Sequence, residues 1–84
     1  MSRKEKLIAR FLRLPSDFTW DELVLLLGWL GYREAQGGKT GGSRRRFIHD
    51  QAPAIMLHKP HPANIVKLYA IREILHLLKH EGLL

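Results

Sequence analysis

Two adjacent stretches in the middle of the chain carry side chains that could hold a phosphate group. The first, residues 37–42, has four glycines in six residues together with Lys39. Glycine amides and a lysine can approach an anion closely, although the stretch lacks the upstream glycine of a P-loop. The second is the run Arg44, Arg45 and Arg46. Together they predict a phosphate-contacting surface, with a plain hairpin loop and a solvated charged strand as the alternatives.

Histidines supply the candidates for proton transfer, because imidazole titrates near neutral pH and is the usual acid or base in RNA cleavage. The five histidines are His49, His58, His61, His76 and His80. The first three flank predicted strands, and we take His49 and His61 as the acid–base candidates. His76 and His80 are four residues apart, a spacing that could bind a metal on a helix. Leu77 stands where an H-E-x-x-H motif requires glutamate, so we expect no metal site.

Length and composition limit what these residues can belong to. The 84 residues carry 14 Lys and Arg against 8 Asp and Glu, and no cysteine. We therefore expect a single domain without disulfides or thiolate metal sites. The net charge of +6 favours a polyanionic partner such as nucleic acid, unless it serves solubility alone. The sequence has neither an apolar run long enough to span a bilayer nor a signal peptide, which predicts a cytoplasmic protein.

Three amphipathic stretches predict helices. Over residues 3–14, apolar side chains recur on one stripe and basic ones fill the remaining positions. Thr19 and Glu22 form a capping box that starts a second helix, which Gly31 is suited to close. Its leucines point in several directions, so we expect this helix to be covered on more than one side. The third predicted helix spans residues 68–80.

Between the second and third helices the hydrophobic pattern favours short strands, at residues 32–36, 44–49 and 54–58. Short connections make antiparallel pairing the simplest arrangement. The predicted fold is therefore α+β, a three-stranded antiparallel sheet with helices on one face, in the order α-α-β-β-β-α. On the second strand, Phe47 and Arg45 share one face and should point to the helices, which leaves Arg44, Arg46 and Ile48 on the open face.

In their order along the chain, several of these features resemble the HicA toxin family. They are Leu30-Gly31-Tyr32 after a helix, Gly42-Ser43 opening a strand that holds Phe47 and His49, a strand followed by His61-Pro62, and a helix ending in Lys79-His80-Glu81-Gly82-Leu83. The resemblance covers residues 19–84. Residues 1–15 form an additional basic helix, and the whole of 1–84 is expected to be one domain.

The resemblance implies a double-stranded-RNA-binding-like fold and a toxin that cleaves mRNA endonucleolytically, without a cofactor, until a HicB-like antitoxin neutralises it. The family motif is commonly Gly-Ser-His, and Arg44 stands here at the histidine position. Arginine keeps its proton and is not an efficient base, but it can stabilise charge on a phosphorus centre. We therefore expect Arg44 to clamp the phosphate, Ser43 to orient it, and His49 or His61 to move protons.

The remaining basic residues of this region are expected to hold the RNA backbone. They are Lys39, Arg45, Arg46 and Lys59, together with the amide of Gly42. Two other functions remain open because Arg44 replaces the family histidine. The chain could be an RNA-binding module without catalytic activity, or it could be a module that binds only its antitoxin.

Overall fold

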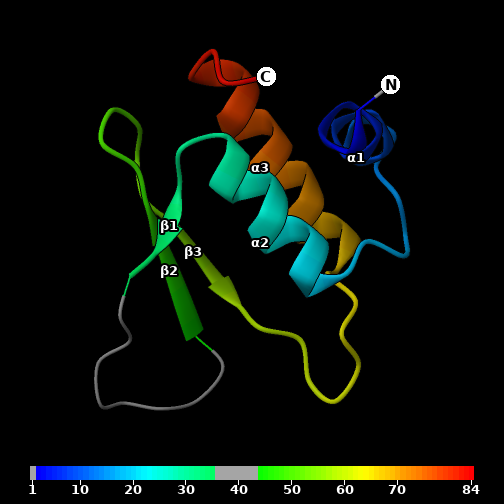
Figure 1. Cartoon of the computed structure of the whole chain (residues 1–84). Helices are drawn as coiled ribbons and strands as arrows, with labels where there is room; N and C mark the ends of the chain where they lie inside the picture. Colours follow the sequence, from blue (N-terminus) through cyan, green and yellow to red (C-terminus); the bar gives the residue numbers. More distant parts are fainter. Residues whose placement is uncertain (1, 36–43) are drawn as a thin grey trace.

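The computed structural model describes residues 2–35 and 44–84. Its elements are the helices α1 (Arg3–Leu12), α2 (Trp20–Trp29) and α3 (Leu68–His80), and the strands β1 (Arg33–Glu34), β2 (Arg44–Ile48) and β3 (Ile55–His58). The predicted order α-α-β-β-β-α is confirmed, and α3 has its predicted bounds (Figure 1). The strands and α1 are shorter than predicted. None of the described helices is long and apolar enough to cross a membrane.

The three strands form one antiparallel sheet in the order β1-β2-β3. The opposite residues of β2 and β3 are Arg44↔His58, Arg45↔Leu57, Arg46↔Met56 and Phe47↔Ile55. Opposite residues on antiparallel strands point to the same face of a sheet, and neighbours along a strand alternate. Phe47 and Ile55 are only 1% and 5% exposed, so the helices cover their face. The prediction that Phe47 faces the helices is confirmed.

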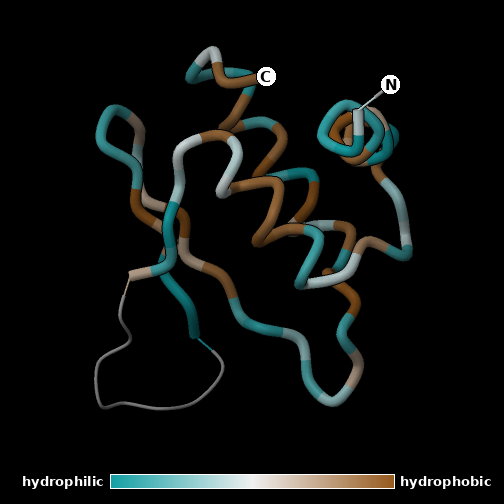
Figure 2. Tube along the Cα trace, viewed as in Figure 1, coloured by the Kyte–Doolittle hydropathy of each residue, from teal (hydrophilic) through white to brown (hydrophobic). Residues whose placement is uncertain are grey.

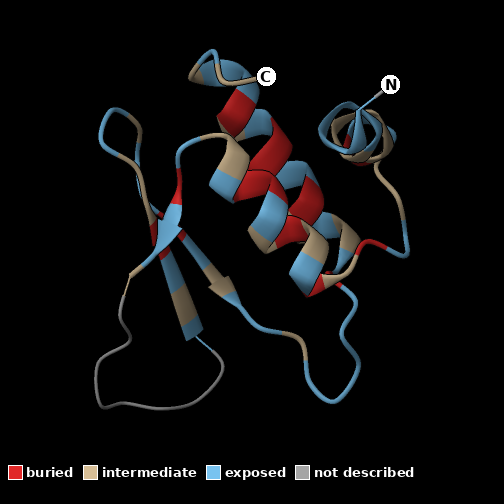
Figure 3. Ribbon diagram, in the orientation of Figure 1, coloured by how far each residue is buried: buried red, intermediate tan, exposed pale blue. Residues whose placement is uncertain are grey.

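The molecule has three layers, which are the sheet, the pair α2 and α3, and α1. Figure 1 shows α2 and α3 side by side on one face of the sheet, with α1 on their outer side. Buried residues gather along the facing sides of α2 and α3 (Figure 3), and the same stretches are the most apolar (Figure 2). On the sheet side, the Trp20 and Phe47 rings lie 5.7 Å apart. Because α1 covers the other side, the prediction that α2 is covered on more than one side is confirmed.

α1 joins the rest of the core through aromatic packing and one arginine. Phe11 and Phe18 are both fully buried, with ring centroids 5.3 Å apart. The Arg10 guanidinium lies over the Phe18 ring and donates hydrogen bonds to Glu22 Oε2 at 2.7 Å and Asp17 Oδ1 at 2.9 Å. Glu22 in turn accepts from the Thr19 backbone N–H in the capping box of α2. Arg10 therefore ties α1 to the first turn of α2.

This arrangement predicts a pH-dependent contribution of Glu22 to stability. Burial raises the pKa of Glu22, but hydrogen bonds from Arg10 and Thr19 lower it by more, so the pKa lies below its ordinary value. A carboxyl group whose pKa is lower in the folded state stabilises the fold at pH values above its unfolded-state pKa. This stabilisation is lost as the pH falls through the folded-state pKa. We expect Glu22→Gln to lower the free energy of unfolding by about 0.5–1 kcal/mol at pH 7. At pH values below the folded-state pKa of Glu22 the two proteins should have equal stability, as urea unfolding at several pH values would test.

Candidate nucleic-acid interface

The face of the sheet opposite the helices carries a row of basic and polarisable side chains. We call the side chains of Arg44, Arg46, Met56 and His58 the open face, because the strand register puts all four on this side and each is exposed. Arg44 lies directly opposite His58, with Cβ atoms expected about 4.5–5.5 Å apart. The open face therefore brings a guanidinium, which stays charged, next to an imidazole, which can exchange protons.

Arg45 points away from this face. Its Nε lies 3.4 Å from Glu34 Oε2, and its Nη1 donates to the Arg44 carbonyl at 3.1 Å. Glu34 lies opposite Phe47 and therefore points to the helix-covered side, as Arg45 does. Glu34 therefore balances the charge of Arg45. Arg45 lies on the opposite face of the sheet from Arg44 and Arg46.

His49 lies just beyond the other end of β2, about 16 Å along the chain from Arg44 at the usual strand rise. Its Nδ1 accepts a hydrogen bond from the Gln51 backbone N–H at 2.9 Å, and its Nε2 lies 3.0 Å from the Leu30 carbonyl oxygen. Because Nδ1 is the acceptor, Nε2 must carry the proton and donate to Leu30. His49 thus fastens the turn after β2 to the end of α2.

Gly31 lies beside the contact between His49 and Leu30 and leaves no room there for a side chain. Its φ is +99°, and a Cβ atom at this position would lie 2.6 Å from His49 Nε2. Beside it, the buried Tyr32 donates a hydrogen bond to the Pro53 carbonyl at 2.8 Å. Burial, and to a lesser degree the charge of Glu81, raise the pKa of Tyr32. The Leu30-Gly31-Tyr32 segment therefore locks the β2–β3 turn in place.

The two glycines at the end of α2 should respond to alanine in opposite ways. We expect Gly31→Ala to destabilise the fold by about 1–2 kcal/mol from the left-handed backbone alone, with the His49 contact adding to the loss. Gly28→Ala has nothing within 4 Å of the new Cβ. It should stabilise α2 by up to about 1 kcal/mol. Thermal unfolding of both variants tests this, and an equal loss in the two would contradict the role given to Gly31.

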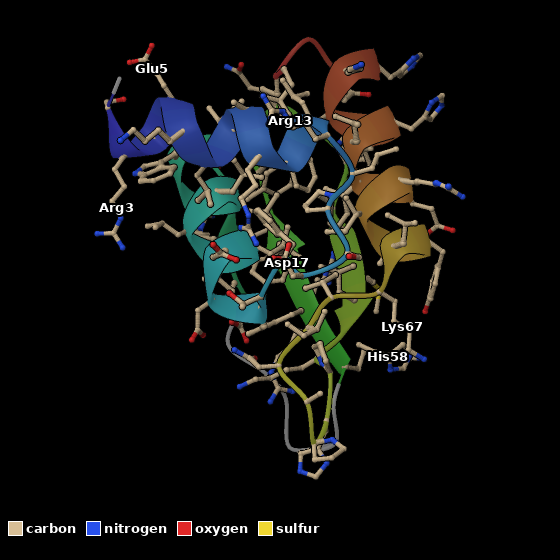
Figure 4. All side chains as sticks on the ribbon, turned by 90° about the vertical axis from the view of Figure 1, so that its right-hand side faces the viewer. Arg3, Glu5, Arg13, Asp17, His58 and Lys67 are labelled. Carbon is tan, nitrogen blue, oxygen red and sulfur yellow. The ribbon has the colours of Figure 1, made fainter. Side chains whose placement is uncertain are left out.

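A pocket of about 550 Å³ opens where β3 ends and α3 begins. Its walls are formed by Trp20, Met56, Leu57, His58, Lys59, Pro60, His61, Val66, Lys67, Tyr69, Ala70 and Glu73. Figure 4 shows His58 and Lys67 close together at the end of the molecule away from Arg3 and Glu5 of α1. His58 therefore belongs both to the open face and to this pocket.

The residues that the sequence analysis selected are thus divided. The structure gathers Arg44, Lys59 and His61 at the same end of the sheet, because β2 begins there and β3 ends there. It turns Arg45 to the opposite face of the sheet and places His49 beyond the other end of β2. Ser43, Lys39 and Gly42 lie outside the described residues. Within residues 2–35 and 44–84, no three histidine or acidic side chains are grouped so that they could hold a metal ion.

His58 was not among the residues predicted for the site, although it flanks a predicted strand. The place of His58 in the site depends on the strand register, that is, on which residues of β2 and β3 lie opposite each other. A turn of six residues between Ile48 and Ile55 makes Arg44 and His58 opposite neighbours, and the turn length could not be read from sequence alone. Tyr69, Lys67 and Glu73 were also missed, since only the fold brings the start of α3 to the end of β3.

Comparison with known protein families matches residues 20–83 to the family described as the HicA toxin of bacterial toxin-antitoxin systems. The match runs from the first residue of α2 to within one residue of the chain end, and leaves α1 outside. Searches of curated proteins and of solved structures found no match. Since the match covers most of the chain, this protein belongs to the HicA toxin family.

Proposed function

We propose that this toxin cleaves mRNA endonucleolytically at the open face of its sheet. The observation that carries the proposal is the pairing of Arg44 with His58 across β2 and β3. A fixed cation beside a group that exchanges protons is what cleavage of a phosphodiester by its own 2′-hydroxyl requires. Membership of the family makes a cognate antitoxin the expected partner, and we propose that a HicB-like antitoxin inhibits the protein by covering this face.

In the proposed reaction, the 2′-oxygen of the RNA forms a bond to the adjacent phosphorus and the bond from phosphorus to the 5′-oxygen breaks. One histidine of the pair His58 and His61 takes the 2′-hydroxyl proton, and the other protonates the departing 5′-oxygen. Arg44 and Arg46 stabilise the negative charge on the phosphoryl oxygens in the transition state. The products are a 2′,3′-cyclic phosphate and a 5′-hydroxyl. No cofactor enters this scheme.

The residues expected from the sequence to bind the phosphate keep their roles, and one of the residues expected to transfer protons is replaced. Arg44 remains the clamp, Ser43 is still expected to orient the phosphate, and Lys59 with Arg46 to hold the backbone. Lys39 and Gly42 also keep their expected role of holding the RNA backbone. His58 replaces His49, because the strand register sets His58 opposite Arg44, whereas His49 lies beyond the other end of β2.

A second function, RNA binding without cleavage, is favoured by the arginine at the family's histidine position. It would use the same open face and need no proton transfer. Incubation of the purified chain with mRNA in a chelating buffer tests the two functions. Fragmented RNA supports the nuclease. Intact RNA that remains bound supports the binding module, and cleavage gained by Arg44→His would then show that only the catalytic group is missing.

RNA binding itself has an expected dependence on charge. Each phosphate that an arginine neutralises releases counterions, so affinity should fall steeply with salt concentration. We expect the double variant Arg44→Ala, Arg46→Ala to bind RNA more weakly at low salt. The slope of log K against log salt concentration should become shallower by about 2. The matched control is Arg13→Ala, because it removes an exposed charge at the C-terminal end of α1. It should change the RNA affinity and its salt dependence much less. Unchanged affinity in the double variant would rule out the open face as the binding surface.

A further inference from the structure

The pocket beside the open face contains an aromatic ring that the proposed cleavage chemistry does not use. Tyr69, the second residue of α3, is 59% exposed on the wall of the pocket. The other Phe, Tyr and Trp side chains of the described residues are buried or half-buried. The pocket volume of about 550 Å³ is in the range of roughly 300–1,000 Å³ that small ligands occupy. An exposed aromatic ring on such a wall can stack on a flat ligand.

The charges around the pocket are unevenly placed. Lys59 follows β3 directly and Lys67 precedes α3, so both lie at the end that holds His58. Glu73 also lines the pocket, one helical turn beyond Tyr69. A phosphate would be attracted to the lysines and repelled by the glutamate. A ligand with a phosphate at one end and a flat, hydrogen-bonding group at the other therefore fits in one orientation.

The floor of the pocket is rigid. Trp20 and Val66 line it and are each only 4% exposed. Two backbone hydrogen bonds hold this region together, from Trp20 N–H to the Asn64 oxygen at 2.9 Å and from Val66 N–H to the Phe18 oxygen at 2.8 Å. They tie the segment before α3 to the start of α2, and Val66 and Trp20 both belong to the core cluster. The pocket is therefore largely formed before any ligand arrives.

We propose that this pocket receives the base of one unstacked nucleotide of single-stranded RNA. The base stacks on Tyr69, and the phosphate of the same nucleotide lies toward Lys59, Lys67 and His58. The inference rests on the RNA-cleaving function proposed above and deepens it, because His58 links the pocket to Arg44. Stacking of bases on exposed aromatic side chains is the common way in which single-stranded RNA is held.

Glu73 gives the pocket a chemical preference among bases. A carboxylate has two acceptor oxygens and no donor. Guanine is the base that presents two neighbouring donors, N1–H and the N2 amino group, along one edge. The same edge of adenine and of cytosine offers one amino group beside a ring nitrogen that accepts. A guanine stacked on Tyr69 with this edge toward Glu73 therefore satisfies both oxygens, and we infer that guanine is the preferred base.

Binding of short RNA tests the site separately from cleavage. The probe is a single-stranded RNA octamer with one central guanosine in a uridine background, methylated at every 2′-hydroxyl so that it cannot be cut. We expect Tyr69→Ala to weaken its binding by roughly 5- to 150-fold, while Tyr69→Phe binds as the wild type does. Glu73→Gln should remove the preference over an all-uridine octamer. Arg72→Ala, an exposed charge on α3 that does not line the pocket, is the control for general electrostatics.

The outcomes distinguish this inference from the proposed function. Wild-type affinity in Tyr69→Ala would overturn the pocket while leaving cleavage at the open face to be judged by the RNA integrity assay. Tyr69-dependent binding by a protein that leaves unmodified RNA intact would support the pocket and remove the nuclease. An equal loss of affinity for a blunt RNA duplex would overturn the single-strand assignment. Circular dichroism of each variant ensures that the comparison is made between folded proteins.

Discussion

Replacing His58 by alanine is expected to slow RNA cleavage by about 10²- to 10⁴-fold, the usual contribution of one acid or base. RNA affinity should fall far less, because Arg44 and Arg46 remain on the open face. The reason is geometric: the sheet register sets the imidazole directly opposite Arg44. Single-turnover cleavage of a labelled RNA measures the rate, and a salt titration of binding measures the affinity.

The matched control for this variant is His76→Ala. His76 is an exposed histidine of α3 whose ring stacks on His80 at 6.5 Å, and it does not line the pocket. Its replacement should leave the cleavage rate within a few-fold of the wild type. Added imidazole should partly restore cleavage by His58→Ala and have no effect on the control. A wild-type rate in His58→Ala together with a large loss in His49→Ala, in a protein that stays folded, would contradict the assignment and return the proton-transfer role to His49.

The second large effect concerns α1, which lies outside the family match. We expect Phe11→Ala to lower the free energy of unfolding by about 3–5 kcal/mol, because the ring is fully buried against Phe18. A domain of this size has a total of only about 4–13 kcal/mol. The melting temperature should therefore fall by at least about 12 °C, as differential scanning calorimetry would show.

Leu12→Ala provides the comparison on the same helix. Leu12 is the next residue along α1 and is 43% exposed, so its loss should cost no more than about 0.5 kcal/mol. Equal, small effects of the two substitutions would mean that α1 is an external appendage rather than part of the core. The same result would argue against the ion pair of Arg10 with Glu22 as a tie between α1 and α2.

The helices were the most predictable part of this fold, because their signals are local. The Thr19–Glu22 capping box, the glycine that follows α2 and the apolar stripe of α3 each lie within a few neighbouring residues. The capping box of Ser2 and Glu5 at the start of α1 was not predicted. Leu12 of α1 and Leu25 of α2 are apolar and yet 43% and 36% exposed. Helical spacing alone does not show how wide a buried stripe is.

The candidate site was less predictable, because it depends on which strand positions face each other. Alternation along β2 was sufficient to separate Arg45 from Arg44 and Arg46, and the structure agrees. Alternation could not show that Glu34 would balance the charge of Arg45, nor that the backbone around Leu30 and Gln51 would engage both nitrogens of His49. The contacts of Arg45 with Glu34 and of His49 with Leu30 join residues that are 11 and 19 positions apart in the chain. The contact of His49 with Gln51 lies in a turn whose shape follows from the sheet.

The chemical groups at the ends of the RNA fragments show whether the 2′-hydroxyl is the nucleophile in cleavage. The purified chain is incubated with RNA in a chelating buffer, and the fragments are analysed by mass spectrometry. We expect fragments that end in a 2′,3′-cyclic phosphate, paired with fragments that begin with a 5′-hydroxyl. No cut should occur where the nucleotide before the cleaved bond lacks its 2′-hydroxyl, because the proposed mechanism uses this hydroxyl as the nucleophile. Fragments with 5′-phosphate ends, or RNA that stays intact while saturated with folded protein, would contradict it.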